Sequence, residues 1–310
     1  MRRAPPRVDL TTSVGSVVLP NPVMTASGTS GHGAELARYG PLDRLGAVVV
    51  KSLAAEPWSG NPAPRLHGTP AGMLNSVGLQ GPGVEAWLED DLPALAASGA
   101  RVVASIWGRT VDDYAKAATA LAAAPPAVVA VEVNLSCPNL EGGRHLFAQS
   151  ASATARAVEA SLSCDRPLWA KLTPNVTDII EIASVATRAG AEAVTLINTV
   201  LGLAIDVETG RPHLGGGGGG LSGPAVHPIA VRAVHDVHQA SPEVTIVGVG
   251  GVATGADAVE LLMAGASAVQ IGTAIFAEPR APWRVLDELM AWCAAHAIDD
   301  VSELIGAVHG

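Results

Sequence analysis

A single cysteine lies between two asparagines in the segment 134–139, which reads Asn-Leu-Ser-Cys-Pro-Asn. The run 127–133 before it is almost wholly aliphatic and predicts a buried strand of a parallel sheet. Catalytic groups in such folds follow the carboxyl ends of the strands. Cys137 could therefore remove a proton while Asn134 and Asn139 hold a polar, planar substrate. A buried structural cysteine in a turn is the alternative, and the hexapeptide alone does not decide between the two.

Two lysines stand at the ends of apolar, strand-like runs, Lys51 after residues 47–50 and Lys171 after residues 168–170. A lysine in such a place is rarely buried without a partner. Each could be a lysine whose charged end reaches the surface at a strand end. Each could also be a cation that faces a carboxylate or an electron-rich ring. Near the pyrimidine edge of a flavin, such a cation would favour the anionic reduced form.

Three glycine-containing elements follow the predicted sixth, seventh and eighth strands, namely 220–223, 248–251 and 272–273. Barrels often hold a phosphate where the last βα loops meet a short helix, because glycines let the backbone approach the oxygens. These elements predict a phosphate-bearing ligand. The residues 219–224 are expected to open the next helix with free N–H groups that suit an anion. The glycines 215–218 before them could be only a flexible connector.

Four asparagines could converge on one site, since three of them follow or end predicted strands and Asn75 lies in a Pro-rich segment. Carboxamides both donate and accept hydrogen bonds, so together they would suit a cyclic imide or amide. The four are Asn75, Asn134, Asn139 and Asn198. Taken singly, each is more typical of a turn. Nothing in the spacing requires His145 to act as a base for Cys137, and no acidic pair or metal-ligand spacing is present, so we expect no metal.

Composition limits the classes of protein to which the chain can belong. It has 310 residues, 48% of them apolar and only 3% aromatic, and a net charge of −10. This charge argues against nucleic acid or an anionic membrane as the main partner. Three widely separated cysteines give neither a disulfide framework nor a metal motif. No apolar signal core follows the N-terminal arginines, and no apolar stretch predicts a membrane helix, so we expect a cytoplasmic protein.

The elements that must position these residues alternate between strands and helices over one domain, residues 1–310. Strands are predicted at 22–25, 46–52, 102–107, 128–133, 168–172, 193–197, 244–247 and 268–271. Helices are predicted at 84–97, 111–123, 151–162, 177–189, 225–238, 256–264 and 283–295, with a weak one at 34–39. Eight such units predict a (β/α)8 TIM barrel rather than an open doubly wound sheet. A Gly/Pro-rich excursion, 52–80, and a hairpin at 203–214 are expected over its carboxyl-terminal face.

These motifs, in this order, resemble those of the class 1 dihydroorotate dehydrogenases, FMN-dependent (β/α)8 enzymes of pyrimidine biosynthesis. The resemblance runs from about Asn21 to Asp299. It is carried by Asn21–Met24, Ala26–Gly28, Val50–Ser52, Gly60–Pro62, Pro64-Arg65, Met73–Gln80, Asn134–Asn139, Lys171–Pro174, Ile197–Thr199, Gly219–Gly223, Gly250-Gly251 and Gly272-Thr273.

The resemblance implies a role for each matching residue. Cys137 takes the position of the general base, which removes a proton from dihydroorotate C5 while hydride passes from C6 to FMN N5. Lys51 would lie between flavin and substrate, and Lys171 beside the isoalloxazine ring. The substrate would be held by Asn75, Asn134, Asn139, Asn198, Thr199 and the backbone of Val77, Gly78 and Leu79. The flavin would contact Ala26, Ser27, Gly28, Lys51, Ser52, Asn134 and Ile197, with its phosphate on Ser222, Gly223, Gly250, Gly251, Gly272 and Thr273.

The segments 221–224 and 264–268 are similar to the NAD-linked 1B subclass, whereas the other class 1 subclass is a homodimer that uses fumarate. The resemblance therefore implies a homodimeric core and an electron-transfer subunit that carries FAD and a [2Fe–2S] cluster. The cysteine separates the chain from the membrane-associated class, which uses serine at that position. Three features depart from the family pattern: the lid loop 140–147, the long glycine run 215–220, and Trp107 in the third strand.

The altered lid leaves two alternatives to dihydroorotate oxidation. One is an FMN-dependent oxidoreductase that acts on another dihydropyrimidine or cyclic imide. The other is a flavin-binding subunit without turnover. The joint presence of Cys137, both lysines and all four asparagines argues against the second.

Overall fold

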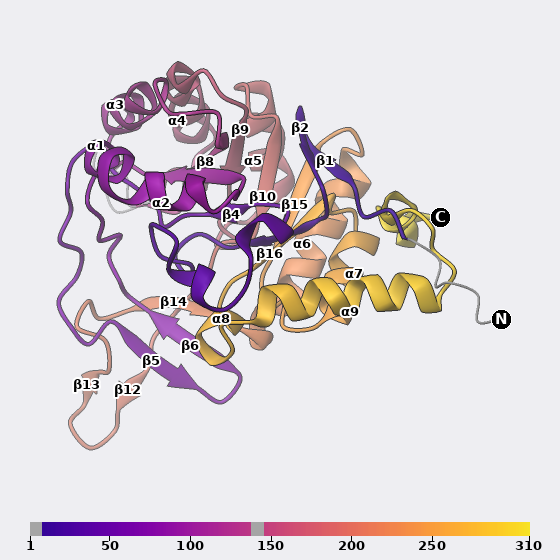
Figure 1. Ribbon diagram of the computed structural model, residues 1–310. Helices are drawn as coiled ribbons and strands as arrows, with labels where there is room; N and C mark the ends of the chain where they lie inside the picture. The colour runs from indigo at the N-terminus through magenta and orange to yellow at the C-terminus, as the bar shows by residue number, and fades with distance from the viewer. Residues whose placement is uncertain (1–7, 138–145) are drawn as a thin grey trace.

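Eight parallel strands form a barrel in this computed structural model, which describes residues 8–137 and 146–310 (Figure 1). In the order in which they pair, the strands are β3 (Val23–Thr25), β16 (Ala268–Ile271), β15 (Thr245–Val249), β10 (Ala193–Leu196), β9 (Leu168–Lys171), β8 (Val128–Asn134), β7 (Val102–Ile106) and β4 (Val48–Val49). A parallel bridge between Met24 and Ala47 joins the two end strands and closes the ring. The predicted (β/α)8 barrel is confirmed.

The barrel interior is packed with side chains, because nearly all strand residues are buried on both faces. Trp169 and Met24 are the large residues of this inner cluster, and both are fully buried. An unpredicted hairpin of β1 (Thr12–Val14) and β2 (Val17–Leu19) adds Val14, Val17 and Leu19 to the same cluster. The Thr12 hydroxyl donates to the carbonyl of Ser267, which immediately precedes β16. The hairpin therefore covers the amino-terminal end of the barrel and leaves the other end for ligands.

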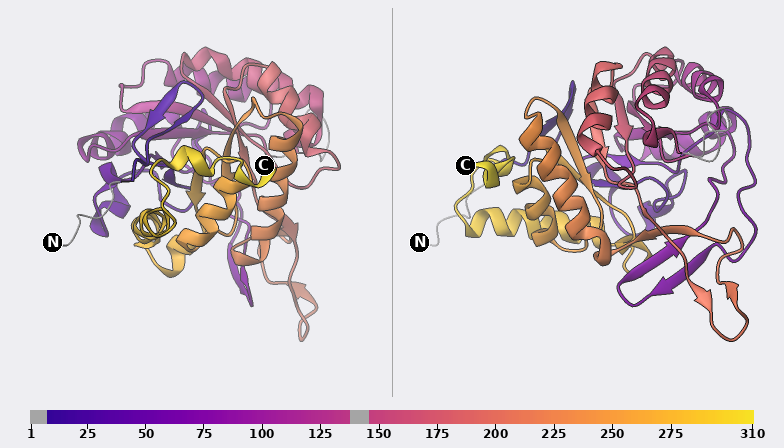
Figure 2. Two further views of the ribbon diagram at one scale, coloured as in Figure 1. Left: turned by 90° about the vertical axis from the view of Figure 1, so that its right-hand side faces the viewer. Right: turned by 180° about the vertical axis from the view of Figure 1, so that it is seen from behind.

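Helices surround the strands (Figure 2). They are α1 (Val84–Ala86) and α2 (Leu92–Ala97), with a π-helical turn between them (Trp87–Asp91), α3 (Val111–Leu121), α4 (Ala151–Ser161), α5 (Ile179–Arg188), α6 (His227–Ala240), α7 (Gly255–Met263), the short α8 (Ala274–Ala277) and α9 (Ala281–Ala295). Side-chain caps at Thr110, Ser150, Asp178 and Thr254 fix where four of them begin. The weak helix predicted at 34–39 is only a 3₁₀ turn, Glu35–Arg38.

A four-stranded antiparallel sheet extends from the carboxyl-terminal face, in the order β11 (Val200–Gly202), β14 (Gly219–Ser222), β6 (Gly72–Asn75) and β5 (Leu66–Thr69). The predicted hairpin beside it is present as β12 (Ile205–Asp206) and β13 (Arg211–Pro212), and it projects away from the barrel on the side opposite the termini (Figure 1). The excursion 52–80 therefore contains a hairpin, β5–β6, that its Gly/Pro-rich sequence does not predict.

The prediction that residues 219–224 open a helix is wrong for the first four of them. They form β14, which pairs with both β11 and β6, and a 3₁₀ turn at Pro224–Val226 leads into α6. Two of the preceding glycines also have backbone partners: Gly215 N–H donates to the Pro64 carbonyl at 2.8 Å, and Gly217 N–H donates to the Leu214 carbonyl at 2.9 Å. The four-stranded sheet and the β12–β13 hairpin together form an arm, and the glycine run takes part in backbone pairing within this arm rather than acting as a loose connector. Across the described stretches, no helix is long and apolar enough to cross a membrane.

Candidate active site

A cavity of about 1100 Å³ opens at the carboxyl-terminal ends of the barrel strands, under the four-stranded sheet. It collects every predicted substrate or cofactor residue in the described part of the chain. These are Ala26, Ser27, Gly28, Lys51, Ser52, Asn75, Val77, Gly78, Leu79, Asn134, Lys171, Ile197, Asn198, Thr199, Ser222, Gly223, Gly250, Gly251, Gly272 and Thr273. Pockets for one drug-sized ligand hold about 300–1000 Å³, so this cavity has room for two ligands side by side.

Cys137 lies behind the cavity wall rather than on it, and its side chain is fully buried. Its thiol donates to the Asn134 carbonyl at 3.3 Å, and the buried Tyr114 hydroxyl donates to the same oxygen at 2.7 Å. Burial raises the pKa of the Cys137 thiol to about 12, while a hydrogen bond with Tyr114 and the Lys51 charge act to lower it. The thiol is therefore neutral near pH 7, and the two groups that favour its ionised form are both in place.

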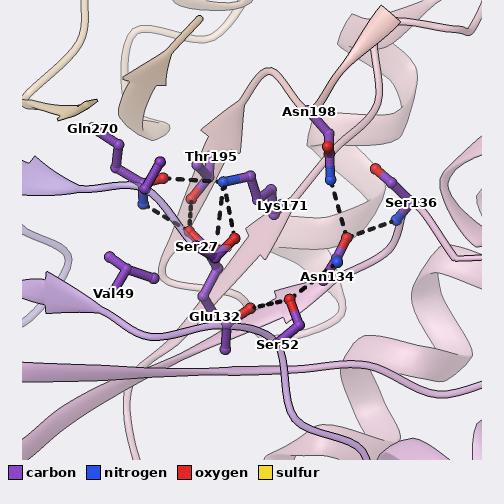
Figure 3. A network of polar contacts seen from close by, with 12 residues as sticks. Ser27, Val49, Ser52, Glu132, Asn134, Ser136, Lys171, Thr195, Asn198 and Gln270 are labelled. Atoms are coloured by element: carbon purple, nitrogen blue, oxygen red, sulfur yellow. Dashed lines mark hydrogen bonds and ion pairs between the residues drawn. The ribbon is translucent and has the colours of Figure 1, made fainter. Parts of the chain in front are cut away.

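Asn134, at the end of β8, is the centre of a group of polar contacts at the cavity wall (Figure 3). Its amide nitrogen donates to the Ser52 hydroxyl at 3.2 Å, and Ser52 in turn lies 2.9 Å from the Ser105 hydroxyl. Its amide oxygen accepts from the amide nitrogen of Asn198 at 3.1 Å and from the backbone N–H of Ser136 at 3.2 Å. The carboxamides of Asn134 and Asn198 are thus fixed against each other, which presents them in one orientation to a planar ligand.

The two predicted lysines differ in their surroundings. Burial lowers the pKa of Lys51, the Cys137 thiolate would raise it, and Lys171 lowers it. Lys171 instead contacts three oxygens, those of Gln270 at 3.0 Å, Ser27 at 3.4 Å and Glu132 at 3.5 Å (Figure 3). Lys171 therefore has a carboxylate partner, and within the described residues Lys51 forms no ion pair.

The late glycine elements make a smooth recess at the α6–α8 side of the cavity. Gly223 and Gly251 have positive φ angles of 100° and 71°. A Cβ on Gly223 would lie 2.7 Å from the Gly72 Cα, and one on Gly251 would lie 2.7 Å from the His227 Cβ. Only glycine allows this close approach, and such a backbone recess suits a phosphate. The Thr273 hydroxyl, which donates to Ser222 at 2.7 Å, adds a polar group to it.

An aromatic wall on the opposite side of the cavity includes residues that the sequence did not single out as ligand contacts. Trp58 and Trp107 meet edge to face with ring centres 6.1 Å apart, and the Arg109 guanidinium lies 4.4 Å above the Trp58 ring. All three line the cavity, and the buried Trp107 indole nitrogen has no hydrogen-bond partner in the part of the chain that the structure describes. The wall therefore gives the cavity lining two indole rings and one guanidinium group.

Several residues near Cys137 fall outside the description or on its boundary. Asn139, His145 and the part of the predicted lid from 140 to 145 lie outside the described residues. The described residues resume at Leu146, and the N–H of the next residue, Phe147, donates to the Cys137 carbonyl at 3.1 Å. The Phe147 ring packs against Tyr114 with centroids 5.2 Å apart. In the described ranges, no group of three His, Cys, Asp or Glu side chains is placed to hold a metal ion.

The important polar groups missed by sequence reasoning are Glu132, Gln270 and Tyr114. Glu132 is an acidic residue inside an aliphatic strand run, and Gln270 is a polar residue inside another. Such interruptions of buried strands are the one signal that could have found them, because a polar group there needs a partner. Tyr114 lies on the buried face of α3, where its spacing resembles that of an ordinary core residue.

Comparisons with known proteins give one consistent result. A family model described as dihydroorotate dehydrogenase matches residues 9–292. The dihydroorotate dehydrogenase B (NAD(+)), catalytic subunit, of Alkaliphilus oremlandii is 47% identical over 94% of this chain and 96% of its own length. The proteins of the same name from Desulforudis audaxviator and Trichlorobacter lovleyi are 48% and 44% identical, over 98% and 97% of this chain and 98% and 99% of their own lengths.

Proposed function

The chain belongs to the dihydroorotate dehydrogenase family, and from that premise we propose how its cavity oxidises dihydroorotate to orotate in pyrimidine biosynthesis. The observation that carries the proposal is the convergence, on one cavity, of all the described residues predicted to hold substrate and cofactor. An oxidoreductase of this kind needs three things from its protein: a seat for the electron acceptor, an oriented substrate and a base.

We propose FMN as the resident cofactor. The cavity has room for a second ligand beside the substrate, and the recess at Gly223 and Gly251 would hold a phosphate through backbone groups. Lys171 and Ser27 on the wall would contact the ring system, with Gly28, at a φ of 94°, allowing close approach. When bound, FMN supplies the acceptor for the hydride that leaves dihydroorotate C6.

The asparagine cluster would bind the substrate. Dihydroorotate presents two imide-type carbonyls, two N–H groups and a carboxylate. Asn134 and Asn198, fixed by their mutual hydrogen bond of 3.1 Å, would pair with the imide edge, with Asn75 and Thr199 beside them. Lys51, a cation with no ion-pair partner among the described residues, would attract the carboxylate. Asn139, which the sequence also predicts as a contact, lies outside the described residues.

Cys137 would act as the base that takes the proton from C5. It must first lose its own proton, and burial opposes this because it raises the pKa of the thiol to about 12. The Tyr114 hydroxyl and the Lys51 cation oppose that effect. The thiol is fully buried and does not line the cavity of the unliganded protein, so proton transfer would require it to come within hydrogen-bond reach of C5, about 2.6–3.2 Å, when the substrate binds.

We also propose an electron-transfer partner. The relatives named above are catalytic subunits of enzymes that use NAD(+), which supports a separate subunit that delivers electrons onward. The partner expected from the resemblance carries FAD and a [2Fe–2S] cluster. The proposed assembly has a homodimer of this chain at its core.

The test of the function is a visible spectrum of the purified protein without oxygen, recorded before and after dihydroorotate is added. We expect a bound-flavin spectrum that bleaches on addition. A protein that lacks flavin, or a flavin that stays oxidised with dihydroorotate, would contradict the cofactor or the substrate respectively.

The test of the base is a Cys137→Ala variant. It should retain FMN, because the thiol lies off the cavity wall, and its flavin should be reduced by dihydroorotate at least ~10²-fold more slowly, the lower range for a general base. Reduction at the wild-type rate would exclude Cys137 as the base. Cys164→Ala, at another fully buried cysteine far from the cavity, is the matched control and should react normally.

A further inference from the structure

A buried carboxylate beneath the cavity has no part in the chemistry proposed so far. Glu132 lies in the middle of β8, and its side chain is fully buried inside the barrel. It does not line the cavity, whereas Lys171 above it does. An isolated buried carboxylate is costly, so its contacts should explain why it is there.

Gln270 joins the carboxylate to the lysine (Figure 3). Its amide nitrogen donates to one oxygen of Glu132 at 2.7 Å, and its amide oxygen accepts from the Lys171 ammonium at 3.0 Å. The two contacts require opposite ends of the amide, so Gln270 can satisfy both in only one orientation. Thr195 adds a second donor to the same Glu132 oxygen at 3.1 Å.

The second oxygen of Glu132 has no hydrogen-bond donor among the described residues and lies 3.5 Å from the Lys171 nitrogen. The carboxylate therefore acts on the lysine mainly through charge at close range and through the bridging amide. The third contact of Lys171 is the Ser27 hydroxyl at 3.4 Å, on the cavity wall. The ammonium is thus held from below by Glu132 and Gln270 and faces the cavity beside Ser27.

We propose that Glu132 is a positioning residue which, with Gln270, fixes the Lys171 ammonium beneath the flavin and offsets its charge, and thereby sets the reduction equilibrium of the flavin. This inference rests on the proposed binding of FMN in the cavity. Two lysines, Lys51 and Lys171, face that cavity, and Glu132, the one fully buried carboxylate among the described residues, offsets the charge of Lys171. Without Glu132, the net positive charge would favour the anionic reduced flavin.

The first measurement compares the flavin reduction equilibrium of the wild type and of Glu132→Gln, by equilibration with a reference dye in the absence of oxygen. Glutamine keeps the shape and removes the charge. We expect the equilibrium to move toward the reduced flavin by at least tenfold, which is about 30 mV for a two-electron couple. A change of less than twofold would overturn the proposal. FMN affinity, titrated with apoprotein, should change much less than this equilibrium.

The second measurement removes the opposite charge, that of Lys171, and then both charges together. Lys171→Met leaves Glu132 unpaired and should move the equilibrium at least tenfold toward the oxidised flavin. The double variant Glu132→Gln/Lys171→Met is again neutral and should return to within about threefold of the wild type. If the flavin reduction equilibrium shifted in the same direction in both single variants, the proposal would be overturned, because such shifts would indicate general disorder of the site. If Glu132→Gln alone fails to fold, the comparison of Lys171→Met with the double variant still measures the charge of Glu132.

Two controls separate this role from a structural one. Thr195→Val removes a hydrogen bond from the same carboxylate but keeps both charges. It should lower the melting temperature of the apoprotein and shift the flavin equilibrium by less than twofold. Glu132→Asp keeps the charge and should restore the equilibrium to near the wild-type value. Failure of the proposed function would look different, because the wild type itself would then bind no flavin or would not be reduced by dihydroorotate.

Discussion

Replacing Tyr114 by phenylalanine tests how the buried thiol becomes a base. The Tyr114 hydroxyl and the Cys137 thiol both donate to the Asn134 carbonyl, at 2.7 and 3.3 Å. A thiolate can no longer donate to that oxygen and becomes a hydrogen-bond acceptor, so the Tyr114 hydroxyl can donate to the sulfur instead. Phenylalanine removes only this donor, because the ring can keep its edge-to-face contact with Phe147.

The size of the effect follows from the worth of a hydrogen bond to a charged group, about 1.5–3 kcal/mol. One pKa unit corresponds to about 1.4 kcal/mol, so the pKa of Cys137 should rise by roughly one to two units in Tyr114→Phe. The pKa of Cys137 in the unliganded wild type is already about 12, so the thiolate is a small minority at pH 8. Each unit of increase therefore lowers the reactive fraction about tenfold at any pH below the pKa.

The assay is anaerobic stopped-flow reduction of the bound flavin by saturating dihydroorotate between pH 7 and 9.5. The wild-type rate should rise with pH, because the active form of the base is deprotonated. The Tyr114→Phe rates should lie roughly 10–100-fold lower on a parallel line, with FMN retention unchanged. Phe147→Leu, which loosens the same packing but keeps the hydroxyl, is the control. A Tyr114→Phe profile that coincides with the wild type would refute the reasoning.

Three further changes test other parts of the site. Gly223→Ala should weaken FMN retention and lower the melting temperature, because its Cβ would lie 2.7 Å from the Gly72 Cα. Gly217 also has a positive φ but has open space around it, so the control Gly217→Ala should cost only the ~1 kcal/mol of backbone strain. Equal losses of melting temperature in the two variants would contradict the role of the close contact at Gly223. Asn198→Ala should raise KM for dihydroorotate about tenfold, the worth of one or two hydrogen bonds, and change kcat less in steady-state kinetics. The pKa of the Cys137 thiol is about 12 in the folded protein and near 9 in the unfolded chain, so its contribution to the free energy of unfolding is lost as the pH rises above 9. Between pH 8 and pH 10, urea unfolding should therefore show Cys137→Ala gaining about 1 kcal/mol of stability relative to the wild type. No relative gain would show that the thiol is not held protonated.

The barrel could be predicted from the sequence because its strands are buried on both faces. Such strands appear as short, continuous aliphatic runs, and β16 was placed at its observed bounds, 268–271. The arm could not be predicted in the same way. Its strands contain glycine and polar residues, and β6 pairs with β14 across about half the chain, as Asn75 opposite Gly220 shows. A local pattern carries no information on a partner so distant in the sequence.

The candidate site shows the same division. Glycines and asparagines at strand ends are recognisable because their positions follow from the topology. The polar groups below the cavity cannot be recognised in this way, because whether Glu132 is paired depends on which residues of β9, β10 and β16 face it. Those partners, Lys171, Thr195 and Gln270, come from three different strands, and only the closed barrel brings them within 3.5 Å.

The pairing of charges around the cavity explains why Tyr114 should matter most after the substrate has bound. Glu132 offsets Lys171, which leaves Lys51 as the cation available to a thiolate at Cys137. Dihydroorotate brings its own carboxylate, and in the proposed binding mode that carboxylate pairs with Lys51. The cation is then partly withdrawn from the thiol at the moment when the thiol must ionise. The Tyr114 hydroxyl is fully buried and carries no charge for the substrate to pair with, so it is the remaining group that favours the thiolate. Tyr114→Phe should therefore slow flavin reduction by a larger factor than the pKa rise of Cys137 in the protein without substrate would give at tenfold per unit.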